Sequence, residues 1–269
     1  MQKKANAQKP IELIYKPIIP GSWHGKDARK LAFKRVLSVL AISFIYLLAG
    51  AFLSFESLWL RMAIAVLIVF TVTYYQWASG VSQGQSDATY GEILYNRRES
   101  GKEIAKEDAD RSFHRFKGLY AVALALIPFV LFTLVFACLT KPTTYHLGVL
   151  PAWTESMMTQ TEFGSALAYY HNQPGLGAMD VMRIIVRAMI MPFMNVAAGM
   201  GSGAALTAER LSPLFVMIAP LGYGLGYMQG LVARAKINTG IKMGDDKKKR
   251  REIKKRKQRQ RSKSPERLI

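Results

Sequence analysis

Four blocks of apolar residues dominate the sequence, and each is long enough to cross a membrane as a helix. They are Val36–Phe55, Leu58–Ala78, Leu119–Leu139 and Leu214–Ala233. About 20 helical residues, rising 1.5 Å each, span a hydrocarbon core of roughly 30 Å. A soluble domain would bury amphipathic elements instead of four near-continuous apolar runs. The blocks therefore predict an all-α integral membrane protein with four transmembrane helices.

The positive charge of the chain is concentrated at its two ends. The sequence holds 37 Lys and Arg against 18 Asp and Glu, a formal net charge of +19. Residues 1–35 carry nine basic and two acidic side chains, and 234–269 carry sixteen and four. The body between them, 36–233, is neutral overall. A neutral apolar body with two cationic ends is not a basic globular protein.

The same basic residues predict the orientation. Lys and Arg near the ends of spans stay on the cytoplasmic side. They are plentiful in both termini and in the 79–117 loop, but 140–180 holds only one. We therefore predict a multi-pass protein of the cell membrane with cytoplasmic N- and C-termini. Its parts are a basic N-terminal segment 1–35, three transmembrane helices in 36–139 with a cytoplasmic loop 79–117, an extracytoplasmic region 140–210, a last transmembrane helix 211–233 and a basic tail 234–269.

Two expectations concern the charged segments in more detail. Both basic termini are predicted to be disordered outside the spans. The stretch 102–117 is charged on all sides, and we expect it to extend the third transmembrane helix into the cytoplasm.

A fifth segment, Val181–Leu206, is also apolar enough to cross. A fifth crossing would export the tail with its sixteen cations, against a potential worth about 2.3 kcal/mol per charge per 100 mV. Asp180, Arg183 and Arg187 fall at i, i+3 and i+7 on one helix face, which is typical of a helix lying in the membrane interface. Pro192 and the glycines at 199, 201 and 203 then interrupt it. We predict an outer amphipathic or re-entrant segment with these three charged residues at the interface. An ordinary fifth span with snorkelling arginines is the alternative.

Glycines at a four-residue period mark the last predicted span. Gly222, Gly226 and Gly230 form a smooth stripe on one face, where another backbone can approach closely. Packing against a neighbouring span is the simplest interpretation. A homodimer contact and a flexible gating helix that uses Pro220 and the glycines are the alternatives.

The densest basic run lies in the tail, where nine of the eleven residues from 247 to 257 are Lys or Arg. The tail predicts adhesion to anionic lipid, worth roughly 1 kcal/mol per basic residue near the surface. Contact with RNA or DNA is the second reading, although the absence of aromatic residues removes base stacking. An anchor that only fixes topology is the third. The contact residues would be Lys247, Lys248, Lys249, Arg250, Arg251, Lys254, Lys255, Arg256 and Lys257.

Signatures of catalysis and of metal or cofactor binding are weak. The sequence contains no HExxH and no GxSxG. The glycine run at 199–203 follows no strand and precedes no Lys-Ser/Thr pair, so it predicts a helix break and not a nucleotide loop. His146, Glu155, Glu162 and His171 have no recognised metal-ligand spacing. We therefore expect no enzyme, no cofactor and no metal.

These patterns favour a scaffold, or an accessory subunit of a membrane assembly, that binds anionic lipid through its polybasic tail. Membrane lipids are the expected partners, with membrane proteins or further copies of the chain as others. A small transporter or permease component, with Asn195 and Arg187 lining a polar cavity, is the first alternative. An insertase-like protein that contacts ribosomes through the tail is the second.

Short motifs carry a resemblance to known sequences. Gly84-Gln-Ser-Asp-Ala-Thr-Tyr-Gly91 is followed by a charged segment, by Arg115-Phe-Lys-Gly118 and by an apolar helix with Pro128. This order, together with Pro220-Leu-Gly-Tyr-Gly-Leu-Gly-Tyr227, resembles small uncharacterised multi-span membrane proteins of Gram-positive bacteria. The resemblance covers about half the chain and implies a bacterial four-span protein, but it implies no activity.

Overall fold

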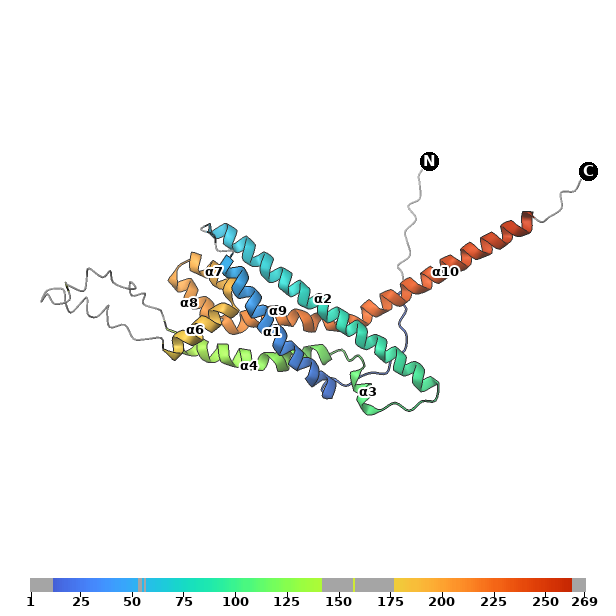
Figure 1. The fold of residues 1–269 in the computed structure, drawn as a ribbon, viewed down its shortest axis with the longest axis horizontal. Helices are drawn as coiled ribbons and strands as arrows, with labels where there is room; N and C mark the ends of the chain where they lie inside the picture. Colours follow the sequence, from blue (N-terminus) through green and yellow to red (C-terminus); the bar gives the residue numbers. More distant parts are fainter. Residues whose placement is uncertain (1–11, 53–54, 56, 142–156, 158–176, 263–269) are drawn as a thin grey trace, which may run out of the picture. The chain divides into compact units, whose positions relative to one another are not determined.

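The computed structural model describes residues 12–52, 55, 57–141, 157 and 177–262, and every regular element in these ranges is a helix (Figure 1). No strand occurs among them, so the predicted all-α class is confirmed. The elements with defined bounds are α1 (Lys26–Phe52), α2 (Leu58–Glu99), α3 (Lys106–Arg111), α4 (Lys117–Leu139), α6 (Ala178–Met189), α7 (Met191–Gly199), α8 (Ser202–Arg210), α9 (Ser212–Met228) and α10 (Gly230–Ser262).

Several of these helices are suited to crossing a membrane. Three of them, α1, α2 and α4, are long and apolar enough by themselves. The pair α6 and α7 is bent by 100° and the pair α8 and α9 by 58°, which gives up to five spans if each bent pair counts as one. The prediction of several helices that are long and apolar enough to cross a membrane is therefore confirmed. The number four stays a prediction.

Helix α2 is much longer than a membrane requires. Its 42 residues measure about 63 Å at 1.5 Å per residue, roughly twice the thickness of the hydrocarbon core. The predicted span ends at Ala78, but the helix continues to Glu99. Residues 79–98 include three glycines, which weaken a helix, but no proline interrupts the segment, and Gly80 and Gly84 pack closely against residues 223–230. Much of the expected 79–117 loop is therefore helical.

The prediction that 102–117 extends the third span is wrong. The described chain forms a separate short helix, α3, then leaves the helical conformation at Ser112, and α4 begins only at Lys117. The break has a physical reason, because the Lys117 side chain turns inward and its ammonium binds the carbonyl groups at the end of α3. A continuous helix would hold those carbonyl groups in its own hydrogen bonds.

The predicted disorder of the tail also differs from the structure. Residues 234–262 belong to α10, whereas 1–11 and 263–269 lie outside the described residues. Lys, Arg, Glu and Gln are strong helix formers, and no proline lies in 234–264. Cations near the C-terminal end of a helix also interact favourably with its dipole. Charge density alone suggested disorder, but it does not outweigh these local preferences.

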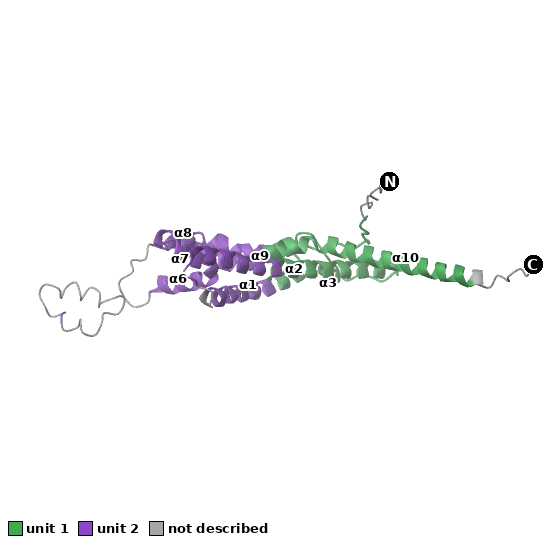
Figure 2. Ribbon diagram, turned by 90° about the horizontal axis from the view of Figure 1, so that it is seen from above, with its two compact units in different colours: residues 1–32, 76–122, 222–269 green, residues 33–75, 123–221 purple. Residues whose placement is uncertain are grey.

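The chain divides into two compact units, which are coloured separately in Figure 2. Unit 1 comprises 1–32, 76–122 and 222–269, and unit 2 comprises 33–75 and 123–221. In unit 1 the core forms around Ala88, Phe113 and Tyr227, with the rings of Phe113 and Tyr227 stacked at 5.4 Å. These residues come from α2, from the linker after α3 and from α9.

Unit 2 has its own core and contains the interrupted helices. Ile42, Tyr46 and Ala219 are buried there, with Ile68 and Val69 packed against them. The segment predicted as an outer amphipathic or re-entrant element forms α6, α7 and the start of α8. Its helices break at Ile190, just before the proline, and at Gly201, whose φ of 107° favours glycine. The glycine run is thus a helix break.

Candidate functional site

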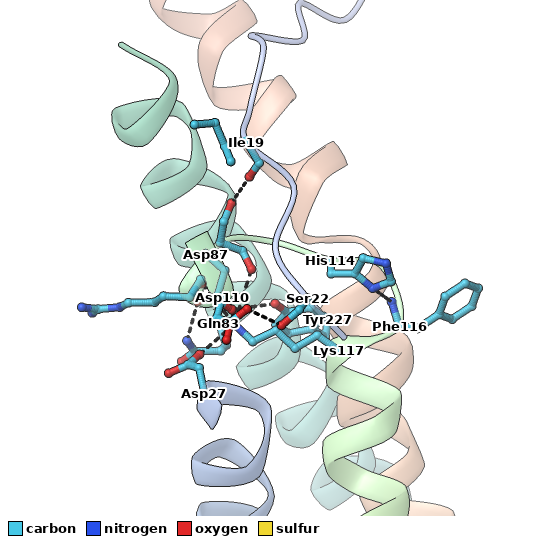
Figure 3. A network of polar contacts seen from close by, with 12 residues as sticks. Ile19, Ser22, Asp27, Gln83, Asp87, Asp110, His114, Phe116, Lys117 and Tyr227 are labelled. Atoms are coloured by element: carbon cyan, nitrogen blue, oxygen red, sulfur yellow. Dashed lines mark hydrogen bonds and ion pairs between the residues drawn. The ribbon is translucent and has the colours of Figure 1, made fainter. Parts of the chain in front are cut away.

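The most unusual group in unit 1 is a lysine that is completely buried. Lys117 has 0% of its side chain exposed, and its Nζ lies 2.7 Å from Oδ2 of Asp27 and 3.2 Å from Oδ2 of Asp87 (Figure 3). A buried ammonium is costly unless it is paired and hydrogen-bonded. Here α1, α2 and α4 each supply one member of the cluster. We call Lys117, Asp27, Asp87 and Tyr227 the Lys117 cluster.

The same ammonium also closes the end of α3. It donates to the backbone carbonyl groups of Asp110 at 3.2 Å, Arg111 at 3.0 Å and Ser112 at 3.4 Å. A lysine often satisfies the last carbonyl groups of a helix in this way. With the two carboxylates, Lys117 has five acceptors for three N–H groups, so some of these bonds are shared.

Asp87 receives further donors that hold it in place. The hydroxyl of Tyr227 donates to its Oδ2 at 2.6 Å, and Nε2 of Gln83 donates to its Oδ1 at 2.9 Å (Figure 3). Two carboxylates facing one ammonium leave an excess negative charge, which these neutral donors partly offset. Because Tyr227 belongs to α9, the cluster ties four helices together.

The linker between α3 and α4 adds contacts around the cluster. Ser112 donates its hydroxyl to the carbonyl of Ile19, and Ser22 donates to Asp110 at 2.7 Å. Burial and the positive charge of Lys117 lower the pKa of His114, whose Nδ1 accepts the backbone N–H of Phe116 at 3.3 Å. The extended residues before α1 are thereby bound to the linker.

A second carboxylate fixes the start of α10. Glu92, with 8% of its side chain exposed, accepts bonds from Arg234 at 2.7 and 3.0 Å and from Asn238 at 2.8 Å. Burial alone would raise the pKa of Glu92, but the bonds from Arg234 and Asn238 outweigh it and lower that pKa. Thr239 accepts the backbone N–H of Ile14 at 2.9 Å. The first three turns of α10 are therefore held by α2 and by the N-terminal segment.

Two of the three stripe glycines lie against α2. A β-carbon on Gly226 would lie 2.1 Å from the carbonyl oxygen of Trp77, and one on Gly230 would lie 2.3 Å from the carbonyl carbon of Gly84. Gly222 is buried as well. Gly80 and Gly84 on α2 face the same contact, so the backbones of two helices touch where neither bears a side chain.

The predicted lipid or nucleic-acid contacts all lie on the distal part of α10. Every residue from 240 to 259 is exposed, which includes all nine basic residues from Lys247 to Lys257. Five of them are consecutive, and successive helical residues are about 100° apart. The cations therefore cover every side of the helix and leave no apolar face. We call residues 240–262 the cationic helix.

The two arginines predicted at the outer interface form ion pairs with a buried carboxylate of the same chain, in unit 2. Arg187 lies 2.6 Å and Arg183 3.3 Å from the carboxylate of Glu209, which is only 2% exposed. Asp180 is half exposed and lies 3.9 Å from Arg183. Thr140 donates to Glu209 at 2.9 Å. Sequence reasoning missed this carboxylate, although Glu209 is the only acidic residue between 181 and 233 and so the natural counterion for two arginines on one face.

The residues suggested for a transport cavity take part in helix packing. Nδ2 of Asn195 donates to the carbonyl of Gly50 at 2.8 Å, and Arg187 is bound to Glu209. Within the described part of the chain, no group of three or more His, Cys, Asp or Glu side chains is arranged to hold a metal ion. The outer residues 146, 155, 162 and 171 lie outside the described residues.

Sequence reasoning also missed the Lys117 cluster. Lys117 was counted among the basic residues of a loop, and Asp87 was not singled out. One signal was present, because Asp87 is the only charged residue between 62 and 91. Its partners are 30, 60 and 140 residues away, and no spacing rule connects them.

Comparison of the chain with known protein families, curated proteins and solved structures identifies no relative. No family model, no curated protein and no solved structure matches this chain. The resemblance to membrane proteins of Gram-positive bacteria therefore stays a prediction, and the functional argument rests on the site.

Proposed function

We propose that the protein is a non-enzymatic membrane scaffold that holds its cationic helix on the cytoplasmic side and binds the anionic lipids of the inner leaflet with it. One observation carries the proposal. The base of α10 is bound by Glu92 and by the glycine contact with α2, whereas residues 240–259 are exposed throughout. A helix with a fixed base and an exposed cationic end is suited to binding an anionic surface.

The proposed orientation has support in the composition of unit 1. This unit contains most of the N-terminal segment, all of 79–117 and the tail, which are the segments that the basic residues assign to the cytoplasm. The chain leaves unit 1 through α1 and returns through α2, then leaves through α4 and returns through α9. The proposal has four crossings, with α6, α7 and α8 as an outer segment.

The lipid contact is favoured by charge and by position. Roughly 1 kcal/mol per basic residue near the surface makes nine residues more than sufficient for strong attraction. Gly240 and Gly244 lie between the fixed base and the basic run, and a β-carbon at either would meet no neighbouring atom. Glycine weakens a helix by about 1 kcal/mol, so the cationic helix can bend here toward the leaflet.

A second candidate is a cytoplasmic nucleic acid such as ribosomal RNA. The specific observation in its favour is that the cations surround the helix and leave no apolar face, whereas helices that lie in the membrane interface usually have one. A polyanion that encloses the helix would use all of its sides, with an attraction that falls steeply with salt.

A single probe on the full-length protein separates the two candidates. Cys138 is the only cysteine, so the double variant Cys138→Ser/Gln258→Cys carries one label on the cationic helix. In nanodiscs that contain phosphatidylglycerol we expect headgroup quenchers to reach this label, and in phosphatidylcholine discs we expect them not to. High salt should reverse the effect. The matched control changes five tail lysines to glutamine, at 247, 248, 249, 254 and 255.

Two results would contradict the proposal. Equal quenching in both kinds of nanodisc would show that anionic lipid is not recognised. If headgroup quenchers reach the label in neither kind of nanodisc, but added RNA shields the label from a soluble quencher, the nucleic-acid candidate is favoured. Orientation is tested separately by a reporter fused after Ile269, because an extracytoplasmic signal there would refute the four-crossing arrangement.

A further inference from the structure

Unit 2 contains a large cavity with almost entirely apolar walls. Its volume is about 820 Å³, within the range of roughly 300–1,000 Å³ that is usual for ligand pockets. Helix α2 provides one wall, with Met62, Val66 and Phe70, and the interrupted helices provide the other, with Phe193, Met200 and Phe215. The cavity exists because α7 and α8 end and restart beside α2, so no continuous helix fills this space.

The walls exclude water as the natural occupant. The only side-chain polar atoms among the described lining residues are two hydroxyl groups. The Thr207 hydroxyl donates to the carbonyl of Gly203, and Oγ1 of Thr73 is buried without a hydrogen-bond partner among the described residues. An ordered water needs two to four polar partners, which this cavity lacks.

The cavity is open to the outside of the protein along part of its wall. Val66, Phe70 and Met200 line it, and each has more than 60% of its surface exposed. They lie beside the apolar stretch of α2, one of the helices suited to crossing a membrane. In a bilayer these side chains therefore meet hydrocarbon, and a lipid chain can enter the cavity laterally.

A cation lies at one rim of the cavity. Arg61 directly precedes the lining residue Met62, and its Nη1 would lie 3.3 Å from a β-carbon on Gly199, which directly precedes the lining residue Met200. The guanidinium is bound to backbone carbonyl groups only, at Phe55 and, at 3.5 Å, at Asn195. No ion pair involves Arg61 among the described residues. No further contact of its N–H groups occurs among the described residues, and the planar fork of arginine matches a phosphate.

We propose that this cavity binds one anionic phospholipid from the bilayer, with an acyl chain between α2 and the α7–α8 segment and the phosphate on Arg61. A long apolar wall with one cation at its end matches the two parts of such a lipid. A neutral lipid would not use the arginine. This site is independent of the cationic helix, which contributes no residue to it, so each proposal can fail without the other.

The experiment uses full-length protein in detergent with added phosphatidylglycerol, and native mass spectrometry counts the bound lipid. The variant Arg61→Gln removes the rim cation, and Ala204→Trp fills the cavity. We expect each to weaken phosphatidylglycerol binding by about tenfold or more. For Arg61→Gln this is the factor for one charge-assisted hydrogen bond, and in Ala204→Trp the indole takes the space of the acyl chain. Matched controls are Arg210→Gln, which removes an exposed arginine, and Leu131→Trp, which adds bulk to an exposed position of α4. Both should bind like the unchanged protein.

The possible outcomes decide the proposal. Loss of binding in both cavity variants but in neither control supports it. It is overturned if both cavity variants bind phosphatidylglycerol like the controls, or if phosphatidylcholine binds as tightly as phosphatidylglycerol. It is also overturned if Ala204→Trp converts a dimer into monomers, because the occupant would then be a second copy. Since Ala204→Trp can disturb folding, Arg61→Gln with an unchanged melting temperature provides the independent test.

Discussion

Tyr227 and Asp87 are 140 residues apart in the sequence, yet the tyrosine hydroxyl lies 2.6 Å from a carboxylate oxygen of the aspartate. The same oxygen faces the ammonium of Lys117. One buried atom thus joins α2, α4 and α9. Since α10 follows α9 after a single residue, this buried contact lies just before the start of α10.

Replacing Lys117 by methionine should destabilise the protein strongly. The variant Lys117→Met leaves Asp27 and Asp87 facing each other without a counterion, and loss of one partner of a buried pair costs about 3–5 kcal/mol. Thermal unfolding in detergent measures the effect. The control is Lys26→Met, because the Lys26–Glu107 pair is more than three-quarters exposed and exposed ion pairs contribute little to stability. Equal melting temperatures for the two variants would show that the cluster is not a source of stability.

Adding one methyl group should have opposite effects at two positions. In Gly226→Ala the new carbon would lie 2.1 Å from a backbone oxygen of α2, so the helices must separate and the protein should lose stability. In Gly240→Ala the carbon would meet no neighbouring atom, and the helix should gain up to about 1 kcal/mol. Melting temperatures of both variants against the unchanged protein measure this. A neutral Gly226→Ala would contradict the close approach of the two backbones.

The sequence predicted much of this fold because long apolar runs leave few alternatives to membrane helices. Four such runs correspond to α1, α2, α4 and α9, and the proline and glycines near 192–203 marked real helix breaks. The Lys117 cluster and Glu209 escaped because their partners lie far apart in the sequence and meet only after the helices pack. The tail was mispredicted for another reason. Its high charge density is typical of disordered segments, but the Lys, Arg, Glu and Gln residues that carry or accompany this charge also favour a helix.

Removing the charge of Glu209 should expose how far Arg183 and Arg187 depend on it. The variant Glu209→Gln leaves two arginines in a partly buried site with a neutral acceptor, so the bent α6–α8 segment should open and lose stability by about 3–5 kcal/mol. Hydrogen exchange of 178–210 in the full-length protein measures the opening. Asp180→Asn is the control, because Asp180 is half exposed and 3.9 Å from Arg183, and its exchange should hardly change. Similar protection in both variants would contradict the role of the Glu209 carboxylate.

The base of α10 should loosen in acid because of Glu92. The bonds from Arg234 and Asn238 outweigh burial and hold the folded-state pKa of Glu92 below the ordinary value of 4.5. A lowered carboxyl pKa contributes stability above pH 4.5, and this contribution disappears as the pH falls through the folded-state value. Hydrogen exchange of 231–239 should therefore accelerate in acid relative to the variant Glu92→Gln, which carries no titrating group at this position.

Glu107 also has a lowered pKa, from its hydrogen bond with Lys26, but that pair is exposed and distant from α10 in sequence. A difference between the two proteins that does not change with pH would refute the assignment to Glu92, whereas convergence of their exchange rates below pH 4.5 would support it.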